Sequence, residues 1–130
     1  VVDISGWSES TIDPFLYRIT LVHRPDKKPE EALAVLDDEI KKVQDKPVSA
    51  AEIQRAVKQA RAVFAYGSEN ITHQAFWMGY TSMFSDYSWY TTYLDKLAKV
   101  TPKDVQRVAQ IYFQTSKRVV GNYIPKGKAA

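Results

Sequence analysis

Two side chains, Glu69 and His73, have the types and the spacing that could bind a metal ion. They lie four residues apart, so a helix would place both on one face, where a carboxylate and an imidazole could share a cation. A third ligand of suitable type is not evident near them, and a surface pair of this kind at a helix start is the commoner arrangement. The sequence therefore predicts no metal site at this pair.

No other group of residues has the pattern of a catalytic site. His23 is the only other histidine, and it precedes Arg24 and Pro25 at the end of a predicted strand, as a loop or strand-edge histidine would. Residues 6–10 start like a nucleophile elbow, but the second glycine and the following helix are missing. Cysteine is absent, which excludes disulfides and thiolate metal sites. We therefore predict no catalytic residue, no metal ligand and no cofactor in this chain.

Aromatic side chains are concentrated between residues 76 and 93. This stretch holds half of those in the chain, namely Phe76, Trp77, Tyr80, Phe84, Tyr87, Trp89, Tyr90 and Tyr93. Such a density suits either a core under packed helices or a wall that binds a peptide, because Trp and Tyr combine a large contact area with a polar group. We favour the core for most of them. The candidate contacts with a substrate or partner are Tyr87, Trp89 and Tyr90, which lie next to a predicted loop.

The charge distribution argues against a nucleic-acid partner. The net charge is +3 and the isoelectric point is about 9.1, but the basic residues are scattered or locally paired. Lys41 and Lys42 follow Asp37 and Asp38 at helical spacing, for example, so we expect these pairs on a solvated helix face. A basic stripe between exposed aromatics is missing. No apolar run reaches membrane-spanning length, so we also expect no membrane partner. Nothing in the sequence indicates the compartment.

The elements that would position these residues are strands near the two ends of the chain. Residues 1–7 predict a first strand, and residues 15–23, whose apolar side chains alternate, predict a second. Turn-forming residues lie between them, so the two strands are expected to form a hairpin. Residues 119–124 predict a third strand.

Helix signals fill the middle of the chain. Pro29 begins a helix with an apolar stripe, and Ser49 and Glu52 form a capping box for a long second helix that Gly67 ends. The stripe of the first helix comprises Leu33, Leu36, Ile40 and Val43.

Three more helices are predicted beyond Gly67. Residues 68–84 read as one, Ser88 is expected to cap a short one, and Thr101 to cap the last, with Pro102 at its first position and Asp104 as the capping-box acid. The residues of the 68–84 helix predicted to face inward are Ile71, Ala75 and Met78.

Together these elements predict one α+β unit over residues 1–130, with antiparallel strands at both ends packed against four to five helices. Its 45% apolar and 25% charged residues are ordinary for a folded domain with one core. A sheet of two or three strands needs a covered face and a protected edge. We therefore expect an unpaired edge that the rest of a longer protein, a second copy or a partner would cover.

Four segments, in order and spacing, resemble the pitrilysin (insulinase) family of zinc peptidases, which includes the mitochondrial processing peptidases. Residues 101–109 resemble the closing helix of a family domain, and residues 13–19 resemble its Asp-Pro strand entry. Residues 48–56 resemble the start of its long helix, and residues 118–125 its final strand and proline. The resemblance covers nearly the whole chain.

The catalytic signature of that family is absent from this chain. The signature is His-x-x-Glu-His on a helix with a further Glu downstream, and neither His23 nor His73 is followed by it. The Arg and Tyr that clamp substrate in the family would lie upstream of Val1. The resemblance thus implies a C-terminal portion of one larger metallopeptidase domain, in which zinc belongs to the parent enzyme and this chain is inactive.

Two functions follow from the resemblance. The first is a non-catalytic portion of a zinc metalloendopeptidase that contributes to the wall of a peptide-enclosing chamber. Its partners would be the remainder of the parent polypeptide or a homologous half, together with the parent's peptide substrate. The alternative is a structural or assembly subunit related to the processing peptidases, without a proteolytic role. In either case the open sheet edge predicts possible self-association.

Overall fold

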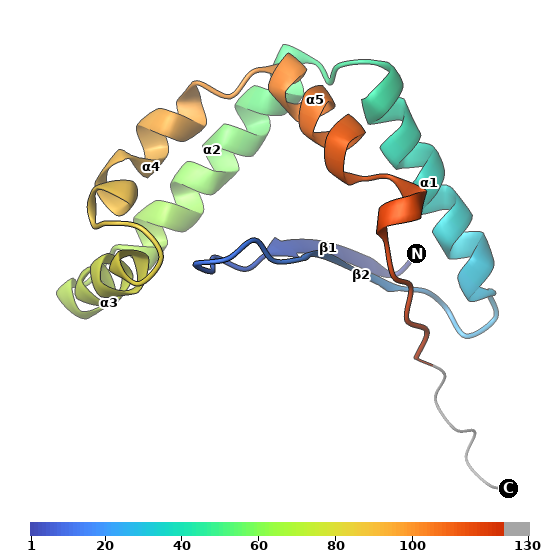
Figure 1. Cartoon of the computed structure of the whole chain (residues 1–130), viewed down its shortest axis with the longest axis horizontal. Helices are drawn as coiled ribbons and strands as arrows, with labels where there is room; N and C mark the ends of the chain where they lie inside the picture. The colour runs from blue at the N-terminus through green and yellow to red at the C-terminus, as the bar shows by residue number, and fades with distance from the viewer. Residues whose placement is uncertain (124–130) are drawn as a thin grey trace, which may run out of the picture.

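The computed structural model describes residues 1–123, and it shows helices arranged as an arch over a β-hairpin (Figure 1). The helices α1 and α5 form one side of the arch, and α2, α3 and α4 form the other. The described residues form two strands, five α-helices and a short 3-10 helix at Thr115–Lys117. The predicted α+β class is confirmed.

The hairpin consists of β1 (Asp3–Ser8) and β2 (Tyr17–Val22), which pair antiparallel as predicted. Ile19 and Leu21 are half-buried on the face that turns toward α1, since alternate strand residues share a face. Gly6 lies opposite Ile19, and a Cβ at Gly6 would overlap the hydroxyl group of Tyr17. A side chain at position 6 would require the Tyr17 ring to move, so glycine fits here without rearrangement.

The helices α1 (Pro29–Asp45) and α5 (Pro102–Tyr112) are joined by glutamine hydrogen bonds. The Nε2 of Gln44 donates to the carbonyl oxygens of Ala109, at 3.0 Å, and Phe113, at 2.9 Å, near the end of α5. Gln106 and Gln110 donate in return to the carbonyl oxygen of Gln44, at 2.9 and 2.7 Å. These bonds join the ends of the two helices, and those from Gln106 and Gln110 provide donors for a carbonyl group in the last turn of α1.

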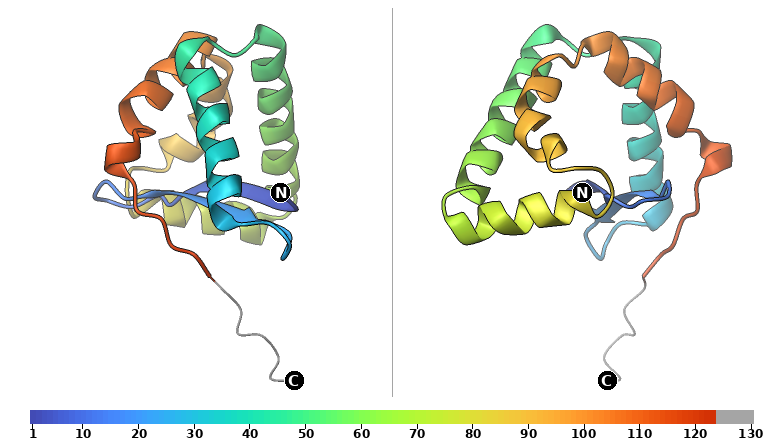
Figure 2. Two further views of the ribbon diagram at one scale, coloured as in Figure 1. Left: turned by 90° about the vertical axis from the view of Figure 1, so that its right-hand side faces the viewer. Right: turned by 60° about the vertical axis from the view of Figure 1, so that its left-hand side comes forward.

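The other side of the arch is built from α2 (Ala50–Gly67), α3 (Ile71–Ser82) and α4 (Ser88–Ala98). Figure 2 shows α2 and α4 side by side, with α3 across one end of the pair. Phe64 of α2 packs on Tyr90 and Tyr93 of α4, with ring centroids 4.9 and 5.7 Å apart. Aromatic packing therefore holds α2 against α4.

Both predicted capping boxes are confirmed, but the predicted cap at Ser88 is wrong. Ser49 with Glu52 and Thr101 with Asp104 exchange the expected pairs of hydrogen bonds. Ser88 is instead the first residue of α4, because the preceding residue already has a helical backbone. The carboxylate of Asp86 accepts a hydrogen bond from the Ser88 N–H at 2.7 Å and takes the place of the expected cap.

The third helix is shorter than predicted, and the residues that it buries differ from those predicted. The side chain of Asn70 accepts a hydrogen bond from the N–H of His73 at 2.9 Å and starts α3 at Ile71. The residues expected to face inward, Ile71, Ala75 and Met78, are exposed, whereas Thr81 is buried. No Asp, Glu, Lys or Arg lies within α3, so its sequence pattern does not distinguish a solvent face from a core face.

The strand predicted at residues 119–124 is not found in the part of the chain that the structure describes. Residues up to Tyr123 belong to no ladder, and Ile124 lies outside the described residues. Arg118 pairs with Asp37 of α1, which holds this segment along the helix and across a cavity from β2. No strand lies beside the segment, so its backbone has no ladder to join.

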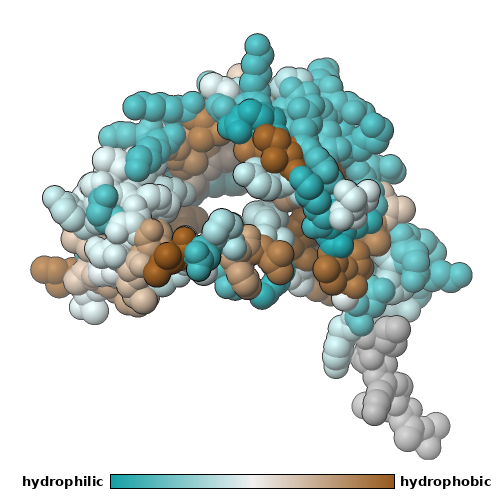
Figure 3. Space-filling model, viewed as in Figure 1, coloured by the Kyte–Doolittle hydropathy of each residue, from teal (hydrophilic) through white to brown (hydrophobic). Residues whose placement is uncertain are grey.

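Little of this chain is buried. The residues described as buried are Ala32, Thr81, Tyr90 and Ala109. The accessible surface is 10824 Å², about half as much again as the roughly 7,000 Å² expected of a compact monomer of 14.8 kDa. Figure 3 shows apolar side chains along the opening between the hairpin and the helices. Two of the four buried residues lie on each side of the arch, so burial is divided between α1 with α5 and α3 with α4.

Candidate functional site

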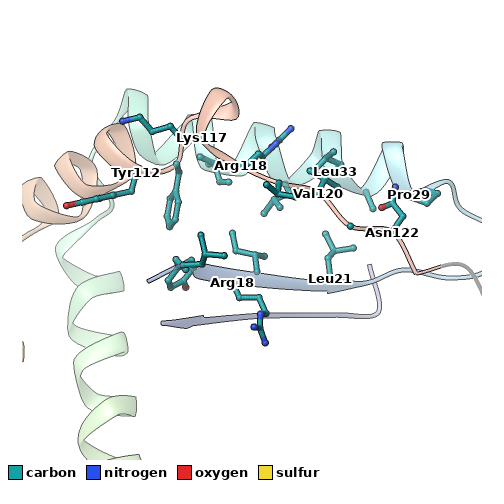
Figure 4. A pocket seen from close by; sticks show the side chains of 18 of the residues that line it. Arg18, Leu21, Pro29, Leu33, Tyr112, Lys117, Arg118, Val120 and Asn122 are labelled. Atoms are coloured by element: carbon teal, nitrogen blue, oxygen red, sulfur yellow. The ribbon is translucent and has the colours of Figure 1, made fainter. Parts of the chain in front are cut away.

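The inner face of the arch carries an apolar groove formed by two adjoining cavities. The first, of about 520 Å³, lies between β2, α1 and residues 117–122 (Figure 4). The second, of about 610 Å³, lies between the later part of α1 and α5. Ile40 and Phe113 line both cavities, so together they form one surface, which we call the inner groove. Apolar side chains of the first cavity include Ile19, Leu21, Leu33, Leu36 and Val120.

A bidentate ion pair between Arg118 and Asp37 fixes one wall of the first cavity. Arg118 Nη2 donates to Asp37 Oδ2 at 2.9 Å, and Nη1 contacts Oδ1. The hydrogen bonds from Arg118 lower the pKa of Asp37, and the same bonds raise the pKa of Arg118. The side chains are about one-third exposed, so solvent screens part of this attraction.

This pair corrects the expectation of a solvated acidic face on the first helix. Asp37 does not pair with Lys41 as the spacing predicted, because Lys41 bonds Asp45 at 3.0 Å. Lys42 bonds Glu39 at 2.6 Å rather than Asp38. Asp37 is thus left for Arg118, which is 81 residues away in the sequence.

The charged side chains around the first cavity are all basic within residues 1–123. They belong to Arg18, Lys117 and Arg118, with His23 nearby on the lining. Arg18 points away from the cavity in Figure 4 and pairs with Glu9 at 3.8 Å. Because Arg118 is also paired, the cavity is mainly an apolar site.

The other face of the hairpin is open and mixed in character. The register places Asp3 opposite Val22, Ser5 opposite Thr20, and Trp7 opposite Arg18, so these six residues share that face. They are all exposed, Trp7 to 64%. We call them the outer sheet face.

The three predicted contact residues lie on the other side of the arch and differ in exposure. Tyr87 is 64% exposed, Trp89 is half-buried, and Tyr90 is buried. The Tyr90 hydroxyl group lies 2.6 Å from the Oγ of Ser68, and its ring packs on Phe64. Tyr90 thus has a packing role in this structure, and contact with a substrate or partner remains a prediction for all three residues.

The aromatic segment forms a continuous series of ring contacts. Phe76, Tyr80, Phe84, Trp89 and Tyr93 follow one another with centroid separations between 5.2 and 6.1 Å. Phe76 at one end is 58% exposed, whereas Tyr93 at the other is half-buried. The segment is therefore part core and part surface.

The residues of this chain do not fit a zinc site. Within residues 1–123 no three His, Cys, Asp or Glu side chains are grouped so that they could hold a metal ion. The Nδ1 of His23 lies 2.8 Å from the carbonyl oxygen of Arg24, and the Nδ1 of His73 lies 3.3 Å from the Nδ2 of Asn70.

None of the helices described here is long and apolar enough to cross a membrane.

The inner groove could be anticipated only in part from the sequence. Alternation in residues 15–23 and the stripe on α1 predicted the apolar faces of two of its walls. No sequence signal marked the Arg118–Asp37 pair, because it joins positions far apart in the chain. The third wall was mistaken for a strand.

Two crystal structures from Bordetella share this fold. The chain aligns with a "putative zinc protease" from Bordetella pertussis Tohama I at a TM-score of 0.82 and 23% identity, over 95% of this chain and 68% of that one. It aligns with the "inactive peptidase domain" of a "putative zinc protease" from Bordetella parapertussis at 0.83 and 23%, over 95% and 66%. Identity at this level shows the fold alone. No family model matches the sequence, and no curated protein matches it.

Proposed function

We propose that this chain is a non-catalytic portion of a zinc metalloendopeptidase of the pitrilysin type, and that it forms part of the wall of a peptide-enclosing chamber. The observation that carries the proposal is an α+β fold shared with chains described as zinc proteases, together with a sheet that is covered on one face only. Zinc and the catalytic base then belong to the parent protein, since the described residues do not fit a metal site.

The outer sheet face is the surface that we assign to the wall. An unfolded peptide presents backbone groups and mixed side chains, and a face that joins Trp7 and Val22 with Ser5 and Thr20 can contact both kinds. Tyr87 and Trp89, on the other side of the arch, remain proposed contacts as well. The inner groove is apolar, and the helices α1 and α5 form part of its walls, so we assign it to packing within the protein rather than to substrate binding.

A structural or assembly subunit without a proteolytic role is the second candidate. It is favoured by the structure described as an inactive peptidase domain, which shares this fold over most of this chain. The two candidates agree that this chain is inactive, and they differ in whether the outer sheet face meets peptides.

The shared part of the proposal is tested by metal content and peptidase activity of the purified chain. We expect less than one-tenth of a zinc ion per chain, a figure on the order of adventitious binding without a ligand set, and no cleavage of an unstructured fluorogenic peptide. One zinc per chain, or cleavage that a chelator abolishes, would contradict it. A chain carrying His73→Ala serves as the control for metal held by surface histidine.

A further inference from the structure

The first cavity lies beside a strand edge that has no partner. The described sheet has only two strands, so β2 pairs with β1 along one edge and has its other edge free. Residues of β2 line the cavity and no residue of β1 does, so the cavity lies nearer to β2 than to β1. The unpaired edge of β2, with its free N–H and C=O groups, is therefore the sheet edge nearer to this cavity.

The opposite wall of the cavity is a second backbone without hydrogen bonds. Arg118 has an extended backbone, with φ −119° and ψ 155°. Within residues 1–123, no hydrogen bond involves the backbone of residues 119–122. Val119 and Val120 both line the cavity, and they are 99% and 47% exposed, so no contact of the described residues covers this backbone.

Helix α1 covers one face of the space between these two backbones. Leu33 and Leu36 of α1 line the same cavity as Ile19 and Leu21 of β2 (Figure 4). This space has a backbone on each of two sides and an apolar helix across one face. A central strand has the same surroundings in a sheet that a helix covers.

We propose that this cavity accepts one β-strand, which pairs with β2 on one side and with residues 119–122 on the other. Its alternate side chains would be aliphatic and pack on α1. The strand comes from the polypeptide that completes the domain, so the inference rests on the proposed function. The Arg118–Asp37 pair acts as a positioning pair, because it holds residues 119–122 at a fixed place along α1.

Two observations favour a permanent strand over a substrate. A strand paired along both edges leaves only when two ladders break, which suits a structural element better than a peptide that must be released. The two Bordetella chains are longer than the part matched here, since this chain covers 68% and 66% of them. About a third of each lies outside the match and is long enough to supply strands.

The test uses the 130-residue chain and a designed strand as probe. The probe is a labelled peptide of alternating threonine and valine with a glutamate at each end, and its control has proline in place of the central valine. Fluorescence anisotropy should show saturable binding of the probe and at least about tenfold weaker binding of the control, because proline cannot donate to a ladder. Equal binding of the two peptides would overturn strand pairing.

Two proline variants test the position of the site. Successive N–H groups of an extended backbone point to opposite sides, so only one of residues 119 and 120 donates into the cavity. Val119→Pro and Val120→Pro should therefore differ, with one weakening the probe about tenfold and the other close to wild type. Both should keep the wild-type circular dichroism, since neither N–H makes a hydrogen bond within residues 1–123. If both variants weakened probe binding equally, or neither weakened it, the assignment would be overturned.

The source of the strand is tested by competition. An unstructured peptide of mixed sequence that displaces the probe would make the cavity a substrate site, and a dimer of the chain that excludes the probe would make a second copy the occupant. Either result would overturn our assignment. Failure here would leave the zinc and cleavage results untouched, so it can be told apart from failure of the proposed function.

Discussion

At the scale of single residues, the structure depends on a few polar contacts that join distant parts of the chain. The Arg118–Asp37 pair ties the C-terminal segment to α1, and Gln44 joins α1 to the end of α5. Both contacts are partly exposed, and each joins residues more than 60 positions apart in the sequence. Two predictions follow from their geometry.

Asp37→Asn should weaken the attachment of the C-terminal segment. The lowered pKa of Asp37 means that the ion pair stabilises the folded chain above the pKa of an unfolded aspartate, about 3.9, and is lost as the pH falls through the lower folded pKa. At pH 7 we expect a loss of about 0.5 to 1 kcal/mol in urea unfolding, as for a partly exposed pair.

The difference between wild type and Asp37→Asn should narrow as the pH falls from about 3.9 toward the lower folded pKa, because the unfolded wild-type carboxyl group takes up a proton before the folded one does. Asp38→Asn, one residue along the same helix, is the control and should change stability little. A difference that stays constant down to pH 3 would contradict the role of the ion pair.

Gln44→Leu should cost about 1 to 2 kcal/mol, because it removes the two hydrogen bonds that Gln44 donates to the carbonyl oxygens of Ala109 and Phe113. Thermal or urea unfolding measures the loss. Gln54→Leu on α2 is the matched control, since Gln54 is exposed, and it should stay within about 0.5 kcal/mol of wild type. Equal losses of stability in the two variants would show that the hydrogen bonds of Gln44 do not stabilise the fold.

At the scale of elements, local signals predicted the helix starts better than they predicted faces or pairing. Proline and capping-box residues placed the starts of α2 and α5, because a cap acts within four residues of itself. The face of α3 was missed because its sequence has no polar side. The strand predicted at residues 119–124 is not found up to Tyr123, because pairing depends on a neighbouring strand, which no local pattern can report.

Thr101→Ala tests the best defined of these starts. The hydroxyl group of Thr101 accepts a hydrogen bond from the N–H of Asp104 at 3.2 Å, and its removal should cost about 1 kcal/mol. Thr101→Ser keeps the acceptor and should recover most of the loss. An unfolding midpoint that is unchanged in Thr101→Ala would contradict the cap.

At the scale of the whole molecule, the site could not be predicted from local sequence patterns, because it forms where distant elements of the open arch meet. The sequence indicated the class, the hairpin and the helix order correctly, and each depends on nearby residues. The inner groove, the Arg118–Asp37 pair and the large exposed area depend on how distant elements meet. A surface this open is expected to recruit a partner.

Self-association should therefore appear as the chain is concentrated, through the free edge of β1. A lysine on an edge strand opposes such pairing, so Ile4→Lys should raise the dissociation constant of the dimer in sedimentation measurements. Ile12→Lys is the matched control, because Ile12 lies in the hairpin loop and is 80% exposed. A wild-type chain that stays monomeric at all concentrations would rule out this edge.

The most direct test of the proposed chamber wall is photo-crosslinking of an unstructured peptide to the chain. Benzoylphenylalanine placed at Thr20 reports on the outer sheet face, and the same residue placed at Val63, which is 71% exposed on α2, reports on a surface with no assigned role. Our account predicts severalfold more labelling at Thr20 than at Val63. Equal labelling at the two positions, or labelling at Val63 alone, would contradict it.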